Sequence, residues 1–144
     1  MRKSVWVGMA VAAGLLAGCA SRGVYESDAV VKETFSVNTN YEAAFRRAGE
    51  YVRVCHVQVQ HAYNVAYAWR HVKGEKGAPD EVQLYKVTEP AKVLELISAE
   101  TDTPSTSKVT VTVLGEGQWD AAEIAAAKAS IQSATPVCRK GAEG

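Results

Sequence analysis

The alternation of apolar and polar residues along the chain predicts a mixed domain of strands and helices. Residues 29–37 alternate with period two, with only Glu33 out of place, and this pattern predicts a strand. Thr39-x-x-Glu42 has the spacing of a capping box and opens a helix. The apolar residues of that helix recur at steps of three and four, and this stripe ends at Cys55.

A long alternation then runs from Val57 to Arg70, and it predicts a strand that begins after a break near residues 61–64. Further strands are expected at 81–88, 93–99 and 108–114, separated by turn-forming loops at 73–80 and 101–107. The leucines and glutamate of 93–99 would suit a helix. Its short length between turn signals favours a strand.

A second helix is expected after the turn at residues 115–117. Asp120 can cap it, with Glu123 as the capping-box partner, and Trp119 and Ile124 occupy the two positions of a hydrophobic staple. Pro136 ends this helix. The order strand, helix, four strands, helix predicts an α+β fold, with an antiparallel sheet of four to five strands and both helices packed on one face. That order is similar to helix-grip or TBP-like domains, including domains of some envelope lipoproteins.

The N-terminus has the layout of a secretory signal. Arg2 and Lys3 precede an apolar run over residues 5–16, which is shorter than the roughly 20 residues of a membrane-spanning helix. The segment Leu16-Ala17-Gly18-Cys19 closely resembles the lipobox of bacterial lipoproteins.

This resemblance implies cleavage before Cys19, a diacylglyceryl group on its sulfur and a further acyl chain, such as palmitate, on its amine. We therefore expect a signal peptide at 1–18, a lipidated cysteine and tether at 19–28, and a single domain at 29–140. Ala20 and Ser21 lack the aspartate that commonly retains such proteins in the inner membrane. In a two-membrane bacterium, the expected location is the outer membrane, with the domain facing the periplasm.

Charge and cysteine count narrow the function. The chain has 16 basic and 16 acidic residues, and removal of the signal takes two basic ones, so the mature chain carries a net charge near −2. A chain with this charge lacks the excess of basic residues that nucleic-acid binding requires, so we expect no nucleic-acid partner. Once Cys19 is lipidated, Cys55 and Cys138 remain, and an oxidising compartment allows them to form a disulfide. The alternative is two buried free thiols.

No catalytic or metal-binding pattern stands out. His56, His61 and His71 lack the spacing of metal ligands, and adjacency of Cys55 and His56 is no evidence for a catalytic pair. We therefore expect no catalytic residues, no metal and no cofactor.

The aromatic residues Tyr63, Tyr67 and Trp69 share one parity of the long alternation. They either line a binding groove or, as we favour, form part of the core face beneath the helices.

The sequence thus predicts a lipid-anchored envelope protein more clearly than an activity. The stretch from Tyr51 to His56 resembles the Y-x-R-x-C-H helix end of small uncharacterised proteobacterial lipoproteins, to which no activity can be attached. We expect a non-enzymatic structural, assembly or adaptor component, joined to the membrane by its lipid and possessing an envelope protein partner. The alternatives are a module that binds a small hydrophobic ligand and an envelope hydrolase.

Overall fold

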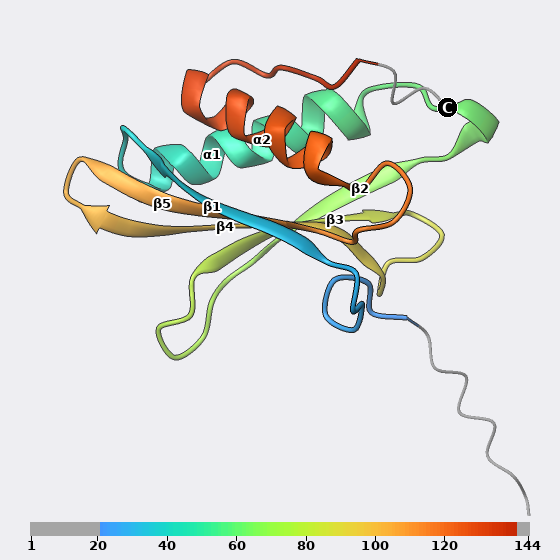
Figure 1. Ribbon diagram of the computed structural model, residues 1–144, viewed down its shortest axis with the longest axis horizontal. Helices are drawn as coiled ribbons and strands as arrows, with labels where there is room; N and C mark the ends of the chain where they lie inside the picture. The colour runs from blue at the N-terminus through green and yellow to red at the C-terminus, as the bar shows by residue number, and fades with distance from the viewer. Residues whose placement is uncertain (1–20, 141–144) are drawn as a thin grey trace, which may run out of the picture.

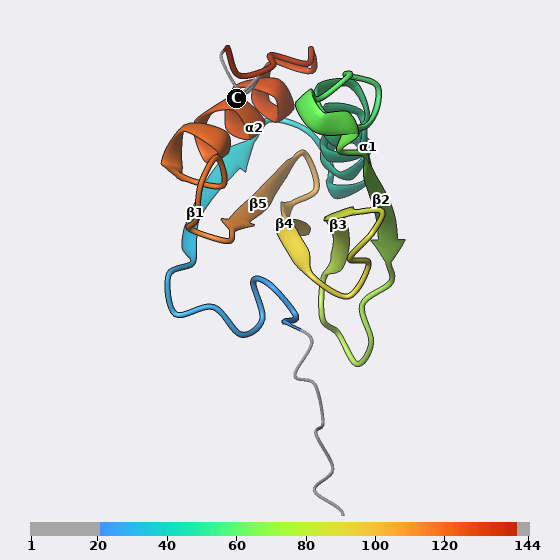
Figure 2. The ribbon, with the colours of Figure 1, turned by 90° about the vertical axis from the view of Figure 1, so that its right-hand side faces the viewer.

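The computed structural model describes residues 21–140, which form an antiparallel sheet with two helices on one face (Figures 1 and 2). The strands are β1 (Val31–Val37), β2 (Tyr67–Val72), β3 (Asp80–Lys86), β4 (Val93–Thr103) and β5 (Thr106–Val113), and the helices are α1 (Tyr41–Val52) and α2 (Ala121–Ser133). The five strands lie in the order β1-β5-β4-β3-β2. The predicted α+β class and element order are confirmed. Among these residues, neither helix has the length and apolarity that a membrane span requires.

The first helix begins one residue later than its capping box predicted. Asn40, not Thr39, is the N-cap, and its side-chain oxygen accepts a hydrogen bond from the backbone N–H of Ala43 at 2.9 Å. Asparagine is a strong N-cap residue, so Thr39 and Asn40 are two adjacent residues that can both cap this helix. The α-helix ends at Val52, and a π-helical turn follows it directly over Arg53–Val57.

The long alternation after this turn becomes a strand only after a break, as predicted near residues 61–64. A short 3-10 turn occupies Ala62–Asn64, and only Tyr67–Val72 forms a strand. Tyr63 and Asn64 have φ angles of 57° and 55°, and this left-handed conformation cannot continue a β-strand. The predicted loop at 101–107 shrinks to two residues, because β4 and β5 extend toward each other to Thr103 and Thr106.

The core lies between the sheet and the helices. On β5, Val109, Val111 and Val113 are fully buried, while Thr110 and Thr112 between them face the other side of the sheet. That second face carries no helix and is largely polar; Thr34 and Thr110, for example, share a hydrogen bond of 2.8 Å across it. We call it the open face of the sheet.

The segment before β1 is not a free tether. Gly23 forms a parallel bridge with Val93, the Tyr25 hydroxyl donates to a carboxylate oxygen of Glu81 at 2.9 Å, and the Ser27 hydroxyl donates to the Leu114 carbonyl. Residues 22–28 therefore lie against the sheet on the side away from the helices, which shortens the predicted tether (Figure 1). The predicted signal peptide and the lipobox, including Cys19, lie outside the described residues.

A disulfide joins the two helical elements. Cys55, in the π-helical turn after α1, is bonded to Cys138, beyond the end of α2, and their Cα atoms lie 5.1 Å apart. The predicted pairing is confirmed.

Candidate functional site

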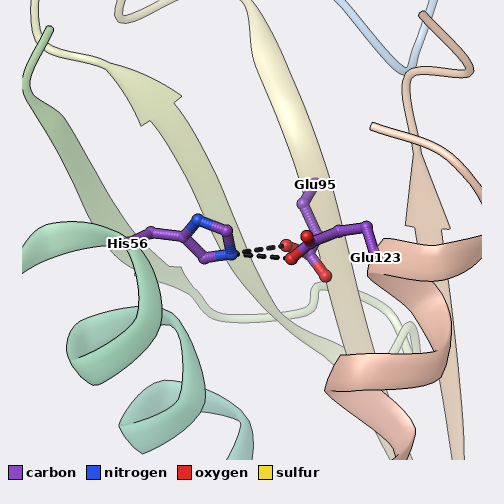
Figure 3. Close-up of side chains that lie close together, drawn as sticks. All are labelled: His56, Glu95 and Glu123. Carbon is purple, nitrogen blue, oxygen red and sulfur yellow. Dashed lines mark hydrogen bonds and ion pairs between the residues drawn. The ribbon is translucent and has the colours of Figure 1, made fainter. Parts of the chain in front are cut away.

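Three side chains with metal-ligand chemistry meet under the helices. His56 comes from the π-helical turn, Glu95 from β4 and Glu123 from the first turn of α2. Figure 3 shows the imidazole directed at the two carboxylates. One ligand-type atom from each residue lies within 4.8 Å of the other two. We call these three residues the His-Glu-Glu cluster.

Glu123 is the best-bonded member of the cluster. Nε2 of His56 donates to Oε1 of Glu123 at 2.6 Å, and the Tyr51 hydroxyl donates to the same oxygen. Oε2 of Glu95 lies 3.7 Å from Nε2 of His56, which is an ion-pair distance but too long for a hydrogen bond. His56 therefore bonds to one carboxylate and faces a second.

Glu95 is the anomalous member. It is 0% exposed, and neither of its carboxylate oxygens has a hydrogen-bond partner. Buried polar groups in folded proteins are almost always hydrogen-bonded, and a buried carboxylate without partners is costly.

Burial and mutual charge set the acidity of the cluster. Burial, together with the negative charge of Glu123, raises the pKa of Glu95 well above its ordinary value. Burial alone would also raise the pKa of Glu123, but the hydrogen bond and charge of His56, and the hydrogen bond from Tyr51, hold it below the ordinary value. Burial and both carboxylates raise the pKa of the Tyr51 hydroxyl, which keeps it a hydrogen-bond donor. The pKa values of the two carboxyl groups are thus shifted in opposite directions.

Aromatic rings close the cluster off from solvent. The ring of Trp119 lies 5.4 Å from that of His56, centroid to centroid, and Tyr67 packs against both. The carbonyl of His56 accepts a hydrogen bond of 2.7 Å from the ring of His61, which fixes the turn that carries the imidazole. The arrangement gives one nitrogen and two oxygen ligands in a dry setting, a combination that can hold a cation.

The aromatic set predicted from the alternation does not form one surface. Tyr63 is 95% exposed on the 3-10 turn, while Tyr67 is buried beneath the helices. Trp69 is half-buried, with its ring against Gly49 of α1. The favoured core interpretation therefore holds for Tyr67, and Tyr63 is wrong as a member of the set.

Trp69 does line a groove. The groove opens at the surface between α1 and the edge strand β2, has a volume of about 460 Å³, and is bordered by Phe45, Gly49, Trp69 and His71. Its lining is more apolar than polar.

Sequence reasoning missed the His-Glu-Glu cluster because its members are far apart in the chain. Glu123 was predicted to reach back as the capping-box partner of Asp120. The side chain of Asp120 does accept from the backbone N–H groups of Ala122 and Glu123, but the Glu123 side chain turns inward. Glu95 carried a usable signal, since it shares strand parity with the buried Ile97 and Ala99 and must point into the core. His56 gave no such signal, because a π-helical turn shifts the direction of its side chain.

Comparisons of the chain with protein-family models, with curated proteins and with solved structures found no match to any of them.

Proposed function

We propose that this protein is a lipid-anchored component of the bacterial cell envelope, held on the outer membrane through acyl chains on Cys19 and facing the periplasm. The observation that carries the proposal is the disulfide between Cys55 and Cys138. Structural disulfides belong to oxidising compartments and are rare in the cytosol, so the bond agrees with the export implied by the lipobox.

The place of the N-terminal segment supports a role as a non-enzymatic adaptor. Gly23 is already fixed to the sheet, so three residues separate it from Cys19, and the four Cα–Cα steps reach about 14 Å when fully extended. The segment lies on the side of the sheet away from the helices. In this proposal the open face lies toward the bilayer, and the helices face the periplasm, where they are available to an envelope protein.

Replacement of Cys19 by alanine is expected to abolish acylation, because only a thiol can form the thioether. Intact-mass analysis of the membrane protein should show the wild type with acyl chains and without residues 1–18, and the variant as an uncut precursor without lipid. The described domain begins after Cys19, so the disulfide should form in both proteins. Equal palmitate incorporation in the two proteins would contradict the proposal.

The adaptor role predicts partner contact through the helices. A photo-crosslinking amino acid at Arg46, on α1 beside the groove, should capture an envelope protein in living cells. The same substitution at Lys108, an exposed basic residue on the open face, should not. Equal capture from both positions, or none from Arg46, would argue against the adaptor role.

The second candidate is the binding of a small hydrophobic ligand, and the groove beside Trp69 is the observation that favours it. In that case, Trp69 fluorescence should change on addition of a fatty acid, and crosslinking from Arg46 should yield no protein partner.

A further inference from the structure

We propose that the His-Glu-Glu cluster is a binding site for one divalent transition-metal ion, with Zn²⁺ as the ion of best-matched chemistry, ligated by His56, Glu95 and Glu123. This inference goes beyond the proposed function and does not depend on it, because metal binding is a property of the purified protein wherever it resides.

The first argument is the convergence of ligands. Imidazole nitrogen and carboxylate oxygen are both zinc ligands, and three such groups from three separate elements meet within 4.8 Å. At a metal–ligand distance of about 2.1 Å, the ligands of a tetrahedral ion lie about 3.4 Å from one another. The 3.7 Å between His56 and Glu95 already fits this spacing, and the 2.6 Å hydrogen bond between His56 and Glu123 would open as the ion replaced the shared proton.

The second argument is independent of the first. Glu95 is 0% exposed, is directed into the cluster, and has two oxygens without any hydrogen-bond partner. Protein groups satisfy His56 and Glu123 through their mutual hydrogen bond, whereas an ionised Glu95 has no donor in the described chain. A cation supplies the missing interaction for the ionised carboxylate.

Charge points to a divalent ion. Metal binding requires both carboxyl groups to be ionised and the imidazole to be neutral, so the ligand set carries two negative charges, and a doubly charged cation brings the buried site to zero. A neutral site is the arrangement that burial favours, since isolated buried charges are strongly disfavoured. The imidazole selects a transition metal over Mg²⁺ or Ca²⁺, which prefer oxygen ligands alone.

The surroundings complete the site. The Tyr51 hydroxyl donates to Oε1 of Glu123 and can orient that carboxylate as a ligand, as outer hydrogen bonds commonly do in metal sites. The rings of Trp119 and Tyr67 exclude water on one side. Because all three ligands are buried, the ion enters when the chain folds or when the helices separate from the sheet.

The test loads the site during folding. Full-length protein in detergent is unfolded in urea with EDTA, its disulfide intact, then refolded with a slight excess of Zn²⁺ and desalted. We expect about one zinc per chain by elemental analysis and a raised melting temperature relative to protein refolded without metal. Mg²⁺ in place of Zn²⁺ should leave the melting temperature unchanged.

Two variants separate binding from folding. Glu95→Gln keeps the size of the side chain and should fold. Loss of a residue that only hydrogen-bonds to a metal ligand lowers metal affinity ~10–100-fold, so loss of the ligand Glu95 itself should lower zinc affinity by more than that. His71→Ala removes an exposed imidazole that lies beside Asp80, and should retain the wild-type zinc content. The inference is overturned if refolded wild type holds less than about a tenth of a zinc per chain, or if Glu95→Gln holds as much as wild type.

Discussion

Replacing Cys55 and Cys138 together by serine is expected to lower the free energy of unfolding by about 4 kcal/mol. The two cysteines are 83 residues apart, so the bond closes a loop that covers most of the domain and removes much of the conformational freedom of the unfolded chain. Small domains are stable by only about 5–15 kcal/mol, so a large share of the total is at stake.

Urea denaturation followed by circular dichroism measures this loss. The third cysteine provides the matched control, since Cys19→Ala lies outside the bonded pair and should not change the midpoint. Reduction of the wild type should reproduce the effect of the double substitution. A loss below about 1 kcal/mol would show that the unfolded chain is already compact, so that closing the loop constrains it little.

Glu123→Ala is expected to destabilise the metal-free protein by about 3–5 kcal/mol, whereas Glu95→Gln should leave it unchanged or more stable. Removal of Glu123 leaves the His56 ring and the Tyr51 hydroxyl buried without their acceptor. Glu95 accepts no hydrogen bond, so its replacement breaks none and removes an acid that cannot ionise at low cost. Two carboxylates of one cluster therefore have opposite expected effects.

The pH dependence of stability distinguishes the two residues, and it is measured by urea denaturation in EDTA. The raised pKa of Glu95 means that the folded state keeps a proton that the unfolded state loses near pH 4.3. Stability from this group is therefore fully present below that pH and falls as the pH rises toward the folded pKa, by up to about 1.4 kcal/mol per pH unit. Glu95→Gln should remove this slope. The lowered pKa of Glu123 acts in the other direction, because its stabilisation is lost only as the pH falls through its folded pKa. An unchanged slope in Glu95→Gln would mean that Glu95 is already ionised in the folded protein.

The features that sequence could predict are those set by local chemistry. The parity of Val109, Val111 and Val113, the Asp120 cap and the cysteine pair were all readable from neighbouring residues, and all appear in the fold. Asn40 replaced Thr39 as the first cap because two capping residues stand side by side and local preference hardly separates them.

The features that it could not predict depend on tertiary contact. Glu123 satisfies a capping-box pattern, yet hydrogen bonds with Tyr51 and His56, 72 and 67 residues away, outweigh the local one. Tyr63 fits an alternation that the left-handed backbone at 63–64 interrupts.

The pairing of β1 with β5 has a consequence for the order in which the fold is assembled. Thr34 and Thr110 are opposite each other in the sheet but 76 residues apart, so the first strand to emerge during synthesis waits for the last. Hairpins among β2, β3, β4 and β5 can form from neighbouring segments, whereas β1 can join only after nearly the whole chain is available. Until then Phe35 and Val37 remain unburied, so the complete core forms only after β5 is available to pair with β1.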